Sequence, residues 1–109
     1  MGYSVEETVR LNQLFDIYQE LLTEKQRVYF GYYFSEDYSL SEIAEILNVS
    51  RNAVHIQIKN IIQHLESFDA KLKLLTNKNL QDELLEKLKK ENLSQETLEL
   101  IEKIEKVRF

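Results

Sequence analysis

Five side chains near the middle of the chain have the types and spacing that contact with nucleic-acid bases requires: Arg51, Asn52, His55, Ile56 and Lys59. On a helix that begins near residue 51, Asn52, Ile56 and Lys59 lie opposite the apolar stripe, with Arg51 and His55 on the flank. Asparagine can pair with adenine, arginine with guanine or phosphate, and isoleucine can contact the thymine methyl. Because the N-terminal end of a reading helix reaches the base edges, this pattern predicts a nucleic-acid-binding face.

A second interpretation of the same face needs no nucleic acid. Arg51 and Asn52 then serve as ordinary polar residues of a first helical turn. Ile56, an apolar residue on an exposed face, would contact a protein partner. Both interpretations remain open from the residues alone.

The charge balance argues that any phosphate contact is weak. The formal net charge is -5, and residues 35–66 carry five acids against two bases, Arg51 and Lys59. Strong duplex binders make about six to ten phosphate contacts, and two cations per reading helix provide far fewer. We therefore expect weak binding, or binding that a partner assists.

Other chemistry has little support in the sequence. His55 and His64 are nine residues apart without a further ligand at helical spacing, and cysteine is absent. Glycine occurs only at positions 2 and 31, so no phosphate-binding loop is present. No serine or histidine is set among residues that would make it a nucleophile or a base. The sequence predicts no enzyme, no cofactor and no metal site.

The elements that position these residues are predicted to be helices. The chain has no proline and two glycines, and its apolar residues recur at helical spacing, which indicates an all-α fold. Ser4 is a candidate N-cap, and the pairs Thr23 with Gln26 and Ser39 with Glu42 have the spacing of capping boxes. Ser50 and Ser94 are further candidate caps. The expected helices span residues 4–22, 24–34, 40–48, 51 to about 75, 79–91 and 95–108.

The stretch "SEIAEILNVSRNAVHIQIKN" has the pattern of a helix-turn-helix. Ala44 is the small residue needed where the two helices cross, and Asn48 takes the left-handed position of the turn. Val49 and Val54 should fill the wedge between the helices. Together with the two caps, this pattern is specific for the fold.

A heptad-spaced apolar seam is predicted to run along the long helix. Its members are Val54, Ile58, Ile61, Leu65, Phe68, Leu72 and Leu75. Such a helix is longer than a small helix-turn-helix core needs, so another element must cover its far end. The first helix, the C-terminal helices and a second copy of the chain are the candidates, and we favour a homodimer.

The aromatic stretch "VYFGYYF" at 28–34 has two interpretations. The simpler is core packing, with Val28, Tyr29, Tyr32 and Tyr33 divided between neighbouring helices. The alternative is a stacking platform for single-stranded bases. That platform would need basic neighbours, which only Lys25 and Arg27 supply.

Residues 21–72 resemble the YlxM-like proteins, small bacterial helix-turn-helix proteins linked to the signal recognition particle. The segment "LNQLFDIYQELLT" at 11–23 is similar to the family's opening helix, and 24–66 is similar to region four of bacterial sigma factors. Six residues match the family's "SR-x-AV-xxx-IK" run: Ser50, Arg51, Ala53, Val54, Ile58 and Lys59. His55 and Ile56 stand where the family often has tyrosine and an acid, so any base preference of the family is not carried over.

This resemblance implies a regulatory role in protein targeting, with the particle's RNA or its GTPase as partner. A DNA-binding transcription regulator and a pure protein-interaction module are the alternatives. We expect one all-helical domain over 1–109, with the helix-turn-helix at 23–66 and a helical extension for packing or dimerisation at 67–109. The opening residues predict no signal peptide, and no apolar run predicts a membrane span, so a cytoplasmic location is expected.

Overall fold

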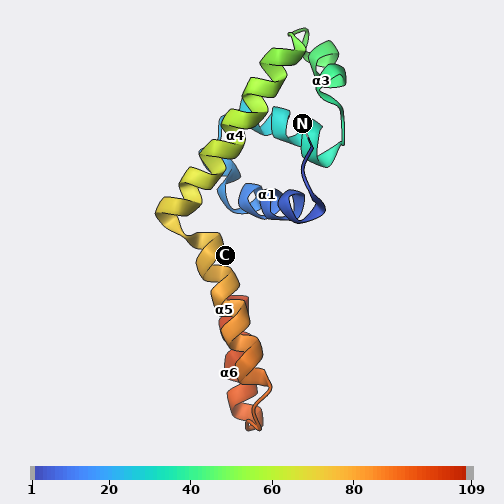
Figure 1. Ribbon diagram of the computed structural model, residues 1–109. Helices are drawn as coiled ribbons and strands as arrows, with labels where there is room; N and C mark the ends of the chain where they lie inside the picture. The colour runs from blue at the N-terminus through green and yellow to red at the C-terminus, as the bar shows by residue number, and fades with distance from the viewer. Residues whose placement is uncertain (1, 108–109) are drawn as a thin grey trace. The chain divides into compact units, whose positions relative to one another are not determined.

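The computed structural model describes residues 2–107, which form helices and no strand, as the all-α prediction requires. The chain divides into two compact units, Met1–Leu72 and Lys73–Phe109 (Figure 1). The first unit contains α1, α2, α3 and α4, and the second contains α5 and α6. Their bounds are Val5–Tyr18, Glu24–Phe30, Leu40–Leu47, Arg51–Leu72, Leu74–Lys89 and Gln95–Lys106. A 3₁₀ turn at Gln19–Leu21 follows α1, and a π-helical turn at Gly31–Ser35 extends α2.

Short polar side chains begin the helices where the sequence predicts. The Ser4, Thr23 and Ser39 hydroxyls each accept a hydrogen bond from the backbone N–H three residues later, and Ser94 does the same for α6. At Thr23 and Ser39 the third residue returns the bond, so both predicted capping boxes are confirmed. Each such cap typically stabilises its helix by about 1 kcal/mol.

The turn between α3 and α4 has the predicted left-handed residue. Asn48 has φ 54° and ψ 49°, and the Val49 N–H donates to the Ala44 carbonyl at 3.0 Å. Ala44 and Val54 are buried between the helices, as expected. Val49 was predicted to fill the wedge as well, but it is 40% exposed. Because the chain changes direction at Asn48, Val49 instead lies at the mouth of a surface cleft with Leu47 and Val28.

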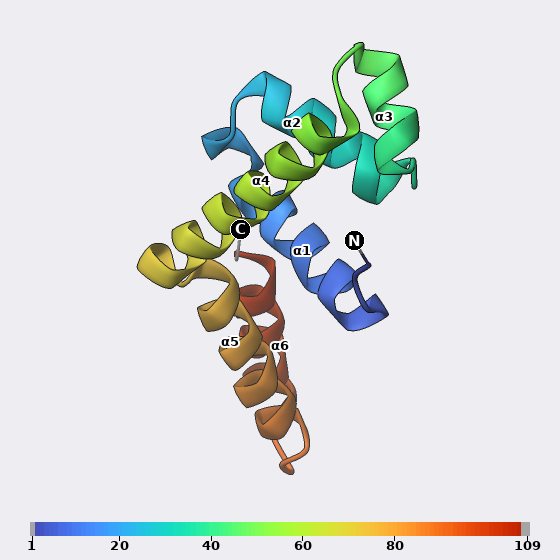
Figure 2. The same ribbon diagram turned by 45° about the horizontal axis from the view of Figure 1, so that its top comes forward.

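The core of the first unit is built around α4. Val54, Ile58, Ile61 and Leu65 are fully buried, and α1, α2 and α3 all contact this helix (Figure 2). These three helices contribute further buried residues, namely Leu11, Leu14, Tyr18, Tyr29, Phe30, Leu40 and Ile43. Burying one such side chain contributes roughly 1.5–3 kcal/mol before the cost of ordering the chain.

Polar contacts fasten α1 to the second half of α4. Arg10 donates to both carboxylate oxygens of Glu66, at 3.2 and 2.9 Å. The Tyr18 hydroxyl donates to the buried Asp69 carboxylate at 2.8 Å. The predicted seam is therefore covered within one chain from Val54 to Leu65, and this part is not open to a second copy.

The long helix ends earlier than predicted. It stops at Leu72, and Lys73 adopts a left-handed conformation with φ 56° before α5 begins at Leu74. The expectation of an unbroken helix to about residue 75 was wrong. The residue that follows Leu65 on the buried face of α4 is Asp69, and Leu72 is 52% exposed. The predicted apolar seam is therefore no longer buried at the end of α4.

The second unit is an antiparallel pair of helices. Lys89 of α5 and Glu105 of α6 form an ion pair at 2.8 Å. Helix α5 begins five residues before the predicted residue 79, while α6 begins where predicted, and the expected end at residue 108 lies outside the described residues. Across residues 2–107, no helix has both the length and the apolarity that crossing a membrane requires.

Candidate nucleic-acid interface

The candidate interface begins at the N-terminus of α4. The Ser50 hydroxyl accepts a hydrogen bond from the Ala53 N–H at 3.0 Å, which starts the helix at Arg51. The first turn contains no acidic residue. A helix N-terminus carries partial positive charge and free N–H donors, so an acid-free first turn leaves that charge available to an anion.

The structure places the five predicted site residues on one side of α4. Arg51, Asn52 and Lys59 are exposed, Ile56 is 48% exposed and His55 is half-buried. Asn52 and Ile56 are four residues apart, and Ile56 and Lys59 are three apart, so their side chains are neighbours on the helix surface. The residues that form this face are thus brought together by the helix itself.

Both cations of this face are available to a ligand. Among the residues that the structure describes, neither Arg51 nor Lys59 enters an ion pair. Arg27, by contrast, is occupied: its guanidinium donates to the Gln19 and Leu22 carbonyls at 3.0 and 2.8 Å. Arg51 and Lys59 are therefore the cations that this face can offer to phosphate.

Acidic residues lie on the neighbouring elements. Glu36 and Asp37 precede α3, and Glu42 and Glu45 are exposed along it. Glu66 belongs to the other end of α4, where Arg10 neutralises it. The negative charge on the α3 side opposes phosphate binding, which agrees with the weak binding expected from the sequence.

Apolar side chains also reach the surface of the helix-turn-helix. Ile46, Val49 and Ile56 are 40–50% exposed. A cleft of about 320 Å³ lies between α2 and the turn, lined by Lys25, Val28, Tyr29, Leu47 and Val49. Sequence reasoning missed this cleft because it assigned Val28 and Val49 to the core, and helical spacing does not reveal which residues border a junction between helices.

The aromatic stretch is divided between the core and the surface. Tyr29 and Phe30 are buried, and the Phe30 ring stacks on Phe15 with centroids 4.2 Å apart. Val28, Tyr32 and Tyr33 were also expected in the core, but Val28 is 41% exposed and the two tyrosines are only half-buried, while Phe30 takes a core position instead. With Arg27 occupied by carbonyls, a stacking platform for bases lacks one of the two cations that it needs.

Residues 2–107 contain no group of three side chains suited to a metal ion. His64 lies against the Phe68 ring, 6.2 Å between centroids, and His55 belongs to the α4 face.

Comparison with known proteins agrees with the geometry. A family model described as "Putative helix-turn-helix protein, YlxM / p13 like", UPF0122, matches residues 5–107. A UPF0122 protein of Halalkalibacterium halodurans is 44% identical over 105 residues, which cover 93% of this chain and 96% of the relative. One from Oceanobacillus iheyensis is 47% identical over 100 residues, with 92% and 95% covered.

A third relative, from Lactococcus lactis, is 43% identical over 104 residues, which cover 95% of this chain and 92% of the relative. The family description names a helix-turn-helix and no reaction. The match extends through both units, so it includes α5 and α6 as well as the helix-turn-helix. On this evidence the chain belongs to the UPF0122 family of YlxM / p13-like helix-turn-helix proteins.

Proposed function

We propose that this protein is a regulatory accessory of the signal recognition particle pathway whose α4 face contacts nucleic acid weakly or with help from a protein partner. The link to the particle rests on membership of the YlxM-like family. The contact with nucleic acid rests on one observation above others: Arg51 and Lys59 are exposed and free of acidic partners beside Asn52 on α4.

Only two cations of this face can contact phosphate, so the electrostatic part of the binding free energy should be small. Two cations release about two counterions, so the logarithm of affinity should fall with the logarithm of salt with a slope near -1.8 per chain. Duplex DNA binders with six to ten contacts have far steeper slopes. An accessory protein that binds nucleic acid within an existing complex does not need more phosphate contacts than these, because the other components of the complex also hold it in place.

Base contact is the second contribution. Asn52 supplies an amide for adenine, Arg51 supplies a guanidinium for guanine, and Ile56 supplies an apolar contact. His55 is half-buried beside them and can add one hydrogen bond. These groups suit a short recognition element within the particle's RNA or within a duplex.

A protein partner would supply the remaining binding energy. The cleft lined by Val28, Leu47 and Val49, together with exposed Ile46, offers apolar area close to the turn. The particle's GTPase is the partner that the family link suggests. The same exposed apolar residues favour a pure protein-interaction module as an alternative.

A DNA-binding transcription regulator is the second candidate function. The geometry of α3, the Asn48 turn and α4 favours it, because this arrangement presents the start of α4 to a major groove. The acidic α3 counts against it unless a partner assists.

We further propose that the protein acts as a homodimer through the α5–α6 pair. Large apolar residues on these helices, and at Val107 directly after α6, are 47–83% exposed: Leu80, Leu84, Leu88, Leu100, Ile104 and Val107. The α5 residues are four apart and form one stripe, and helical spacing places the α6 residues on the same face of the antiparallel pair. With nine acids and nine bases, residues 67–109 carry no net charge that would oppose self-association.

The proposed function can be tested by fluorescence anisotropy of three labelled ligands at 50 and 150 mM salt: random duplex DNA, the particle's RNA and the particle's GTPase. We expect the RNA or the GTPase to bind more tightly than the duplex, and duplex binding to weaken at the higher salt concentration. If duplex DNA binds with micromolar affinity and neither the RNA nor the GTPase binds, the result would instead support a transcription regulator.

A further inference from the structure

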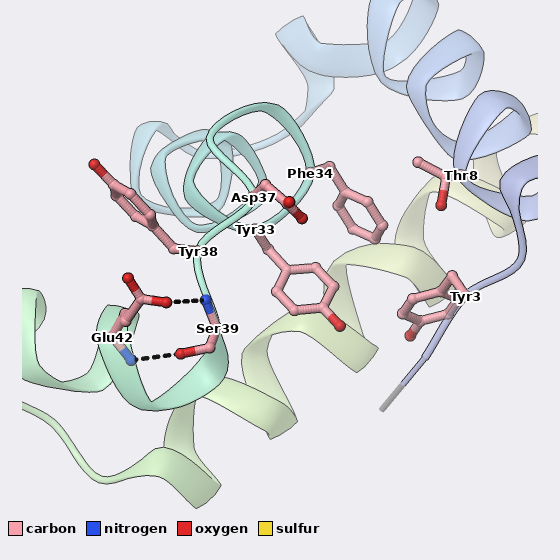
Figure 3. Close-up of a pocket in the computed structure, with 8 residues that line it drawn as sticks. All are labelled: Tyr3, Thr8, Tyr33, Phe34, Asp37, Tyr38, Ser39 and Glu42. Carbon is pink, nitrogen blue, oxygen red and sulfur yellow. Dashed lines mark hydrogen bonds between the residues drawn. The ribbon is translucent and has the colours of Figure 1, made fainter.

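A second surface of the first unit has the opposite electrostatic character to the α4 face. A cavity of about 370 Å³ lies where the N-terminal segment, the turn after α2 and the start of α3 meet (Figure 3). Its walls include Tyr3, Tyr33, Phe34, Asp37, Ser39 and Glu42. None of these residues belongs to the α4 face, and the proposal below holds whether or not that face binds nucleic acid.

Three of the four aromatic side chains that line the cavity lie close to one another. The Tyr33 and Phe34 centroids are 4.9 Å apart with an interplanar angle of 88°, and Tyr3 lies 5.6 Å from Phe34 and 6.3 Å from Tyr33. Because the rings stand at steep angles to one another, their faces and edges point in several directions. A ring face attracts a cation that approaches within about 6 Å.

The charged residues in the cavity lining are acidic, which favours a cationic ligand. Asp37 and Glu42 are part of its lining, and no lysine, arginine or histidine is. One Glu42 oxygen is used by the capping box, where it accepts the Ser39 N–H at 3.1 Å. Asp37 enters no hydrogen bond or ion pair that joins it to another of residues 2–107. Its carboxylate is therefore free to pair with a cation that enters.

The tyrosines do not offset this negative charge. Burial raises the pKa of Tyr33, and the Asp37 carboxylate raises it further. Burial raises the pKa of Tyr3 as well, with smaller contributions from Tyr33 and Glu7. Both phenols stay neutral at physiological pH, so the carboxylates determine the sign of the cavity, which repels phosphate and attracts cations.

Size and shape select among cations. A volume of about 370 Å³ is in the range of pockets that take organic groups. A guanidinium suits the walls better than an ammonium, because its plane stacks on aromatic faces and its paired N–H groups match a carboxylate. A protein partner with a basic segment presents such a group.

We propose that this cavity binds an arginine side chain from a basic segment of a protein partner, with the guanidinium against the Tyr3, Tyr33 and Phe34 rings and paired with Asp37. The protein then has two faces of opposite preference, α4 for an anionic ligand and the aromatic cavity for a cationic one. One molecule could in this way contact both components of a ribonucleoprotein.

The test uses an acetylated and amidated tri-arginine peptide, with tri-lysine as the matched ligand, titrated into the full chain and followed by NMR. We expect backbone shifts concentrated at Tyr33, Phe34 and Asp37, and tighter binding of tri-arginine than of tri-lysine. Shifts spread over all acidic surfaces, or equal affinity for the two peptides, would overturn the proposal.

Two variants and a control separate a site from general charge attraction. Asp37→Asn keeps a residue that tolerates the left-handed backbone at φ 57° and should weaken tri-arginine binding about tenfold. Tyr3→Leu removes one ring outside the helices and should weaken binding without lowering the melting temperature. Asp16→Asn, on an exposed position of α1, removes the same charge and should change affinity less than about twofold. Equal losses for Asp37→Asn and Asp16→Asn would contradict a specific site.

Discussion

The two units of the chain bury their apolar residues to very different extents. Among the described residues, thirteen apolar side chains are buried in the first unit, against three in the second, which are Leu75, Leu85 and Ile101. The first unit has covered its core, although eight large apolar residues, among them Ile46 and Ile56, are 40–81% exposed on its surface. The second, about half as long, leaves six large apolar residues 47–83% exposed. The first unit is thus suited to presenting a binding face, and the second to being covered by another surface.

Core truncation should have the largest effect and should distinguish the units. Ile58→Ala removes a fully buried side chain between several helices, so we expect a loss of about 2–5 kcal/mol in unfolding free energy. Ile101→Ala, in the sparsely packed pair, should cost less than half as much. Denaturant unfolding followed by circular dichroism measures both variants. Equal losses would show that the second unit is packed as firmly as the first.

Charge placed on the apolar face of the second unit should break the proposed dimer. Leu84→Glu adds a carboxylate to an exposed leucine in the middle of the α5 stripe, and desolvating that charge opposes association. We expect the molecular mass measured by light scattering to fall from dimer to monomer. The helical content should be retained, because Leu84 lies outside the buried core.

Asn79→Glu is the matched control, since it adds the same charge at an exposed position of α5 on the side of the helix away from the stripe. It should leave the mass unchanged. A monomeric wild-type protein, or a Leu84→Glu variant that remains dimeric, would show that this face is not the dimer interface.

The turn residue of the helix-turn-helix should give the smallest effect. Asn48→Ala forces a β-carbon residue without a local hydrogen-bonding side chain into the left-handed region, which costs about 1 kcal/mol. Asn48→Gly should be close to neutral, since glycine adopts this conformation freely. Thermal melts compare the two. If alanine is tolerated as well as glycine, the conformation of the turn is less restrictive than the φ value indicates.

Local signals explain why much of the fold could be predicted from the sequence. Caps such as Ser39 and the turn at Asn48 act over three or four residues, and the buried face of α4 follows from helical spacing alone. The break at Lys73 carried no such signal, because lysine is an uncommon residue for a left-handed position and no glycine or proline marks it.

The candidate site was predictable only where a single helix forms it. The five residues from Arg51 to Lys59 share a face of α4, so spacing alone brings them together. The aromatic cavity joins Tyr3 to Tyr33 and Glu42, which come from three separate segments, and the cleft at Val49 depends on how α2 meets the turn. Tertiary packing creates both, and one-dimensional patterns do not record it.

The central claim is that the α4 face of the first unit contacts nucleic acid through Arg51 and Lys59. The most direct measurement compares the binding of labelled duplex DNA and of the particle's RNA by wild type, by Arg51→Ala with Lys59→Ala, and by Lys103→Ala with Lys106→Ala. The last variant removes two exposed cations from α6. We predict at least a tenfold loss and a salt slope reduced by about 1.8 for the α4 variant, with unchanged melting temperature and little change for the control. Unchanged affinity of the α4 variant, or an equal loss in both, would contradict the claim.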